Sequence, residues 1–146
     1  MPFIVWTSEM SLDVKMLDND HKRLAILINE LHDGLLDGRA KEALEGIFEE
    51  LVAYTRIHFA HEEQLLSVAG SSGAETHKQK HNHEFEQILD LQVHFRSATE
   101  SAAYFEVLDK LRDWLFAHTA GIDKESVAHL KVTGVDSIMA GWKEPE

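Results

Sequence analysis

The sequence contains no cysteine and only two prolines among its 146 residues. Without cysteine, neither a disulfide framework nor a thiolate metal site can form. Because proline is rare and glycine occurs only eight times, long helices are favoured over many short strands joined by turns. Long apolar runs are also absent. The N-terminal run "PFIVW" is too short for a signal peptide, and no window approaches the ~18–20 apolar residues of a membrane span.

Basic residues are few as well. Lysine and arginine number 14 against 26 aspartates and glutamates, which gives a formal net charge of −12. This balance argues against a nucleic-acid or anionic-membrane partner, and it lowers the free-energy cost of holding a metal cation. Since neither a signal peptide nor a membrane span is found, we expect a cytoplasmic protein with no membrane insertion.

The apolar residues that are present recur with a period of 3.6 residues in four stretches, which predicts four helices. The first follows "LDND", where Asp18, Asn19 or Asp20 could supply the N-cap, and it ends near Gly34–Gly38. The second runs from about Lys41 to Val68. The third begins near Ala74 and ends at "RSATES". The fourth is capped by Ser101 and ends at Gly121.

Short connections between helices of similar length favour antiparallel neighbours. The predicted fold is therefore all-α: an up-and-down antiparallel four-helix bundle, with an N-terminal arm and a partly helical C-terminal tail. We expect one domain over residues 1–146, with the arm at 1–17, the bundle at about 18–122 and the tail at about 123–146.

Histidine is the residue in excess, with ten in the chain. Five of them fall on the apolar stripes of the four predicted helices, together with one carboxylate. Two pairs, His58 with Glu62 and His77 with His81, are spaced by four residues, which puts their Cβ atoms roughly 5–6 Å apart on one helix face. The inward-facing polar set is His21, His58, Glu62, His77, His81 and His118.

A single histidine on an apolar face is usually a hydrogen-bonded core residue. Five on four separate stripes are harder to satisfy in that way, because each unpaired buried polar group costs about 1–3 kcal/mol. A bound metal would satisfy them. Asp123 lies five residues after His118, about 140° away on a continuous helix, but Gly121 would allow the helix to end and Asp123 to turn back toward the site.

The remaining histidines are predicted to lie on the solvated surface. His61 is displaced from the inward stripe by about 60°, so a contact with the ligands is the alternative for that residue. This second set is His32, His61, His83, His94 and His129.

In chain order, the motifs "LDNDHKRL", "HFAHEE", "HKQKH" and "WLFAHTAGID" resemble those of the hemerythrin family, in particular its single-domain bacterial members. The resemblance covers residues 6–126, and it implies a non-haem di-iron centre inside the bundle. By similarity, one iron would be bound by His77, His81 and His118, and the other by His21 and His58. Glu62 and Asp123 would bridge the two irons, together with an oxo or hydroxo group.

These ligands fill all but one of the coordination positions of two six-coordinate irons, and the open position suits O2. We expect reversible O2 binding, as an oxygen carrier, store or delivery protein, rather than an enzyme. Residues that could line the O2 pocket, or be ordinary core, are Leu24, Ile28, Tyr54, Trp114 and Leu115.

Other functions fit the same residues. The alternatives are an O2, redox or iron sensor acting through a partner protein, and a di-iron oxidase or peroxidase. Zinc also accepts imidazole and carboxylate ligands, but seven ligands are too many for one tetrahedral zinc ion. Haem is the weakest alternative, because the chain has no haem-attachment motif.

Overall fold

A computed structural model describes residues 2–12, 14–68 and 74–120 of the chain. In these ranges there are four long helices and no strand. They are α1 (Lys15–Leu36), α2 (Lys41–Val68), α3 (Ala74–Ser97) and α4 (Ser101–His118), preceded by a single 3-10 turn, η1 (Ser8–Met10). None of these helices is long and apolar enough to cross a membrane.

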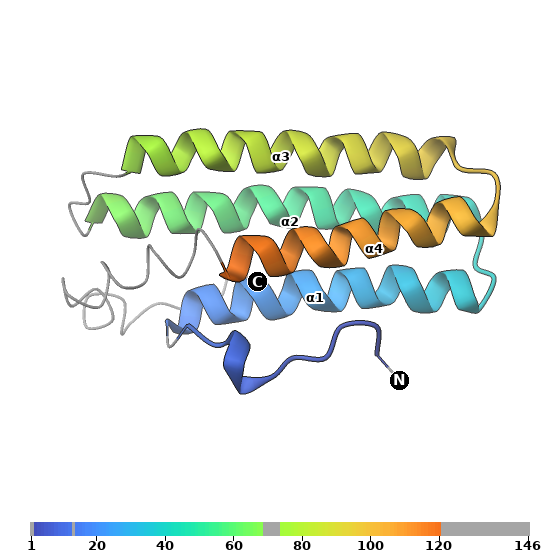
Figure 1. The fold of residues 1–146 in the computed structure, drawn as a ribbon, viewed down its shortest axis with the longest axis horizontal. Helices are drawn as coiled ribbons and strands as arrows, with labels where there is room; N and C mark the ends of the chain where they lie inside the picture. The colour runs from blue at the N-terminus through green and yellow to red at the C-terminus, as the bar shows by residue number, and fades with distance from the viewer. Residues whose placement is uncertain (1, 13, 69–73, 121–146) are drawn as a thin grey trace.

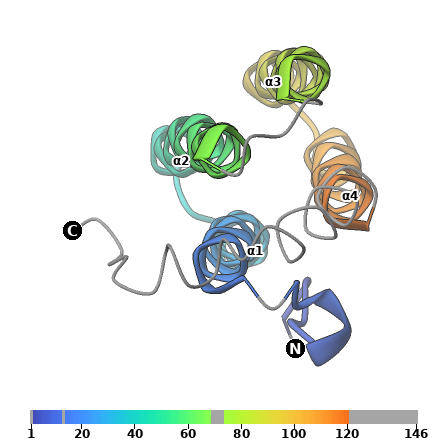
Figure 2. The same ribbon diagram turned by 90° about the vertical axis from the view of Figure 1, so that its left-hand side faces the viewer.

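The helices lie side by side along the length of the molecule (Figure 1) and, viewed end-on, occupy the corners of a square (Figure 2). Each helix packs against its neighbours in sequence, and α1 also packs against α4, which closes the bundle. The predicted all-α, up-and-down four-helix bundle is confirmed.

Two predicted helix starts are wrong. The N-cap of α1 is Val14, not one of the residues 18–20, so the helix begins earlier than the sequence suggested. Asp18 lies in its first turn and accepts hydrogen bonds from the Ser11 hydroxyl (2.6 Å) and the Leu12 amide (2.8 Å). A carboxylate there is favoured by the helix dipole without being the cap. Ser101 is likewise the first residue of α4, after Glu100 as N-cap.

The turn between α1 and α2 depends on one glycine. Gly38 follows the helix end with a φ of 70°, in the left-handed region. Its amide donates to the Leu35 carbonyl, and the Arg39 amide donates to the Gly34 carbonyl. This is the Schellman arrangement, in which a residue other than glycine is strained.

Gly38→Ala is therefore expected to lower the free energy of unfolding by about 1 kcal/mol, because a Cβ disfavours positive φ. Gly46 provides the matched control. It lies inside α2, and a Cβ added there would meet no atom within 4 Å. Gly46→Ala should be neutral or stabilising by about 0.5–1 kcal/mol. Urea unfolding of the two variants checks the difference, and equal stabilities would contradict it.

The interior of the bundle is divided along its length. At the end where α1 meets α2 and α3 meets α4, the core is apolar and centres on Phe48 and Phe95, whose rings pack 5.3 Å apart. At the other end, where α1 begins and α4 ends, the interior carries the histidines. The polar groups of the core are therefore concentrated at one end of the bundle.

The N-terminal arm packs against α1 and α4. The side-chain amide of Asn29 pairs with the main chain of Ile4, accepting from its N–H (2.7 Å) and donating to its C=O (2.9 Å). Phe3 stacks on the ring of His32 at 4.5 Å, and the Arg112 guanidinium lies over Phe3 at 4.8 Å. His32 is therefore half-buried, and its predicted place on the solvated surface is wrong.

Candidate metal centre

Six polar side chains gather inside the histidine-bearing end of the bundle, and all of them are buried. One comes from α1, two from α2, two from α3 and one from α4. They are His21, His58, Glu62, His77, His81 and His118. The helical register explains the convergence, because each residue shares a stripe with apolar core residues on its own helix.

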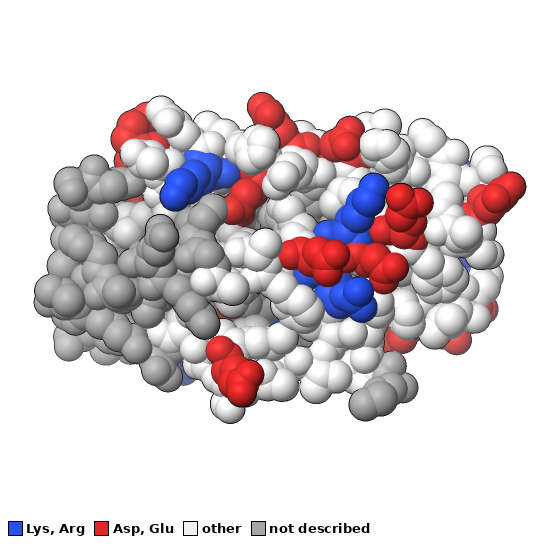
Figure 3. Space-filling view, in the orientation of Figure 1, with Lys and Arg blue, Asp and Glu red and all other residues white. Residues whose placement is uncertain are grey.

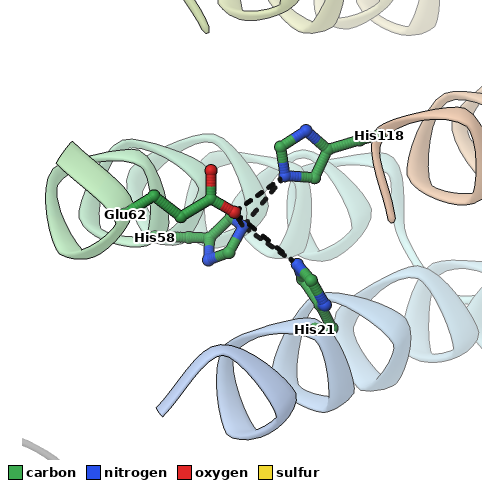
Figure 4. Close-up of side chains that lie close together, drawn as sticks. All are labelled: His21, His58, Glu62 and His118. Carbon is green, nitrogen blue, oxygen red and sulfur yellow. Dashed lines mark hydrogen bonds and ion pairs between the residues drawn. The ribbon is translucent and has the colours of Figure 1, made fainter. Parts of the chain in front are cut away.

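Glu62 lies at the centre of this group. Its Oε1 is 2.8 Å from Nε2 of His58, 3.3 Å from Nε2 of His118 and 3.9 Å from Nε2 of His21. Figure 4 shows these three imidazoles pointing at the same carboxylate from three helices.

The second oxygen of Glu62 has its own imidazoles. Oε2 is 2.6 Å from Nε2 of His81 and 3.1 Å from Nε2 of His77. Two groups of ligand atoms able to hold a metal ion therefore share one carboxylate. A carboxylate with imidazoles at each oxygen has the arrangement of a bridge between two metal positions.

The donor set fits a cation. The Nε2 atoms of His21 and His58 are 3.1 Å apart, and those of His58 and His118 are 3.0 Å apart. Nitrogen lone pairs that face each other at this distance repel unless a proton or a metal ion lies between them. Imidazole nitrogen with carboxylate oxygen suits iron, zinc and similar divalent ions.

His118 lies between the two groups. Its ring centroid is 5.7 Å from that of His21 and also 5.7 Å from that of His81. The closest contacts of its Nε2 are nevertheless on the Oε1 side of Glu62, with His58, whereas the resemblance assigns it to the iron of His77 and His81. Asp123, the remaining predicted ligand, lies outside the described residues.

Asp20 lies on the outer side of this cluster, and its contact with the cluster was not predicted. It is fully buried on α1 and accepts from Nδ1 of His58 (2.9 Å), Nδ1 of His61 (2.8 Å) and the Tyr54 hydroxyl (3.0 Å). Burial raises the pKa of Asp20, but the hydrogen bonds and positive charge of the two histidines outweigh burial and lower that pKa to about 2. Asp20 is therefore ionised at neutral pH.

The sequence did contain a pattern that indicates that Asp20 is buried. It lies four residues before Leu24 and seven before Leu27, on the same buried stripe of α1. The same contact corrects the prediction for His61, which is a partner of Asp20 rather than a purely solvated residue. His83 and His94 are exposed, as predicted.

Asp20→Ala is expected to destabilise the metal-free protein, because the buried Nδ1–H of His58 loses its acceptor. Such a loss costs about 1–3 kcal/mol. Urea unfolding of the metal-free variant measures it. Asp109→Ala, at an exposed site on α4, is the control and should change stability by no more than about 0.5 kcal/mol. An Asp20 variant as stable as this control would contradict the role given to the carboxylate.

The five residues predicted to line an O2 pocket belong to the apolar core or pack against it. Leu24, Ile28 and Leu115 are buried, Trp114 is 8% exposed and stacks on His118, and Tyr54 is half-buried. Trp114 therefore contacts the cluster through His118, and Tyr54 contacts it through Asp20. The contact of these five residues with O2 stays a prediction.

A histidine-rich cation site inside an antiparallel four-helix bundle is the arrangement that defines hemerythrin-like proteins, and the comparisons agree. The family model described as "Hemerythrin HHE cation binding domain" matches residues 12–130. The chain belongs to the hemerythrin family.

Relatives cover nearly the whole chain. A bacteriohemerythrin of Pseudomonas aeruginosa is 33% identical, over 97% of this chain and 94% of the relative. A bacteriohemerythrin of Methylococcus capsulatus is 30% identical, over 85% of this chain and 94% of the relative. A crystal structure of a hemerythrin point mutant superposes with a TM-score of 0.75 at 25% identity, covering 89% of this chain and 98% of the other.

Proposed function

We propose that this protein binds O2 reversibly at a non-haem di-iron centre, as an oxygen carrier, store or delivery protein. The proposed ligands are His21, His58, Glu62, His77, His81, His118 and Asp123. The observation that carries the proposal is the division of five imidazoles between the two oxygens of Glu62. Two ferrous ions held there would supply the electrons that O2 takes up when it binds.

The number of ligands supports binding of a small molecule. If five imidazoles, two bridging carboxylates and one oxo or hydroxo group held two six-coordinate irons, one coordination position would stay open. Following the resemblance, we assign His77, His81 and His118 to one iron and His21 and His58 to the other, with the open position on the latter. The location of His118 between the two groups leaves it within reach of either.

The protein's own contribution is to orient the imidazoles and exclude water. The carboxylate of Asp20 fixes a proton on Nδ1 of His58, so the lone pair of Nε2 faces the interior. The side chains of Leu24, Ile28 and Leu115 are at most 3% exposed. An apolar surround that excludes water and proton donors favours reversible binding over net oxidation.

The test is the visible spectrum of the purified full chain with metal analysis, recorded as isolated, after anaerobic reduction and after re-aeration. The expected result is two irons per chain and an absorption band that disappears when O2 is removed and returns with it. Two irons that pass directly to a stable ferric spectrum would favour the sensor or oxidase alternatives. One zinc per chain without colour would refute the di-iron centre.

A further inference from the structure

A carboxylate from α3 contacts the outer nitrogen of the α4 histidine. Oε2 of Glu84 lies 2.6 Å from Nδ1 of His118, and both side chains are largely buried, at 12% and 0% exposed. The two atoms are within ion-pair distance, although their angles are not those of a hydrogen bond, and a proton between them would remove the repulsion of their lone pairs. Imidazole is the stronger base of the two, which places that proton on Nδ1 of His118.

The position of the proton determines which nitrogen of His118 can bind a metal. A neutral imidazole with its proton on Nδ1 keeps its lone pair on Nε2. Nε2 of His118 faces the interior, 3.3 Å from Oε1 of Glu62. The contact with Glu84 therefore selects the tautomer that a ligand at this position needs.

Glu84 also contacts Trp114, which stacks on His118. The indole N–H of Trp114 donates to the main-chain oxygen of Glu84 (3.2 Å), and the Trp114 ring stacks on His118 at 5.9 Å with an interplanar angle of 10°. Glu84 therefore makes both contacts: its side chain lies beside the imidazole of His118, and its main-chain oxygen accepts from the indole of Trp114. Together they restrain the orientation of the His118 ring.

Glu84 borders solvent on its other side. Together with Trp114 and His118 it lines a groove of about 510 Å3 between α3 and α4. Figure 3 looks onto this face, where carboxylates lie along α3 and charged side chains of both signs gather over α4. Because water can enter such a groove, truncating Glu84 leaves no dry cavity in the core, and we expect the variants to fold.

We propose that Glu84 is a positioning residue of the metal centre, which holds His118 in the tautomer and orientation that aim Nε2 at Glu62. The proposal rests on the proposed function, since it assigns His118 as a ligand. A carboxylate behind a ligating histidine typically contributes 10–100-fold to metal affinity. Substituting Glu84 should therefore weaken one of the two metal positions by roughly that factor.

The first test is titration of the metal-free full chain with Co2+ in competition with a chromophoric chelator. Glu84→Ala is expected to weaken one of the two binding steps about 10–100-fold. Glu84→Gln, which keeps an oxygen acceptor but no charge, should fall between Glu84→Ala and the parent protein. Glu86→Gln, at an exposed site on the same helix, is the matched control and should bind as the parent does. Parent-like affinity in both Glu84 variants would overturn the proposal.

The second test is the tautomer of His118, read from the 15N shifts of its ring in metal-free protein. The expected result is a proton on Nδ1 in the parent and a gain of the Nε2–H form in Glu84→Ala. A parent protein with the proton on Nε2 would overturn the proposal. This measurement separates the two claims: binding of fewer than two metals would refute the di-iron centre, while the tautomer still decides the role of Glu84. If Glu84→Ala does not fold by circular dichroism, the affinity test is decided on Glu84→Gln and the tautomer test on the parent protein.

Discussion

Glu62→Gln is expected to reduce the metal content from two ions per chain to one or none. Glu62 is 2% exposed and has imidazoles at each of its oxygens. Glutamine has nearly the same shape, but its amide NH2 would face imidazole nitrogens and cannot bind a metal. The bridge would be lost while the packing is kept. Metal analysis after reconstitution with ferrous iron measures the effect.

Glu50→Gln is the control for this substitution, because Glu50 lies on the same helix at an exposed site. It should retain the metal content of the parent protein. Circular dichroism should show both variants to be equally helical. A folded Glu62→Gln protein with two tightly bound ions would contradict the bridging role.

Phe48→Ala is expected to lower the free energy of unfolding by about 3–5 kcal/mol. The Phe48 side chain is fully buried on α2 and packs against Phe95 of α3 in the apolar end of the bundle. Truncation removes apolar contact and leaves a cavity that the surrounding helices can fill only in part. Urea unfolding of the metal-free protein measures the loss.

Phe116→Ala provides the comparison. Phe116 is 37% exposed on α4, so its truncation should lower the free energy of unfolding much less. The metal content gives a second readout. Because Phe48 lies at the end of the bundle away from the histidines, folded Phe48→Ala should still hold two metal ions. Loss of metal from the folded variant would show that the two ends of the core are not independent.

The helices themselves were largely predictable. The bounds of α2 were predicted at Lys41 and Val68 because glycine-rich or polar segments interrupt a strong apolar period there. The start of α1 was not predictable, because the sequence shows which residues could cap a helix but not which partner each carboxylate binds. Asp18 instead holds the preceding segment, and Asp20 accepts hydrogen bonds from another helix.

The inward-facing histidines were predictable for a different reason. Each lies on an apolar stripe, and a polar residue on such a stripe is visible in a single helix. Contacts between helices leave no such pattern. Glu84 and His118 are 34 positions apart in the chain. His61 was predicted to be solvated because its partner, Asp20, lies on another helix, α1. The inward position of the five histidines and of Glu62 could therefore be predicted, and Asp20 left a signal on its own buried stripe, whereas the contact of Glu84 with His118 left none.

The location of the histidines at one end of the bundle has a consequence for the order of folding. At the apolar end, short turns join α1 to α2 and α3 to α4, so those contacts close small loops at low entropic cost. The contact of His58 with His118 joins the two halves of the chain and requires both hairpins to have docked. The contact of Glu62 with His77, by contrast, closes only the short α2–α3 connection. We therefore expect the group of His21, His58 and His118 to be completed last, so that its metal position forms only in a chain that is already folded.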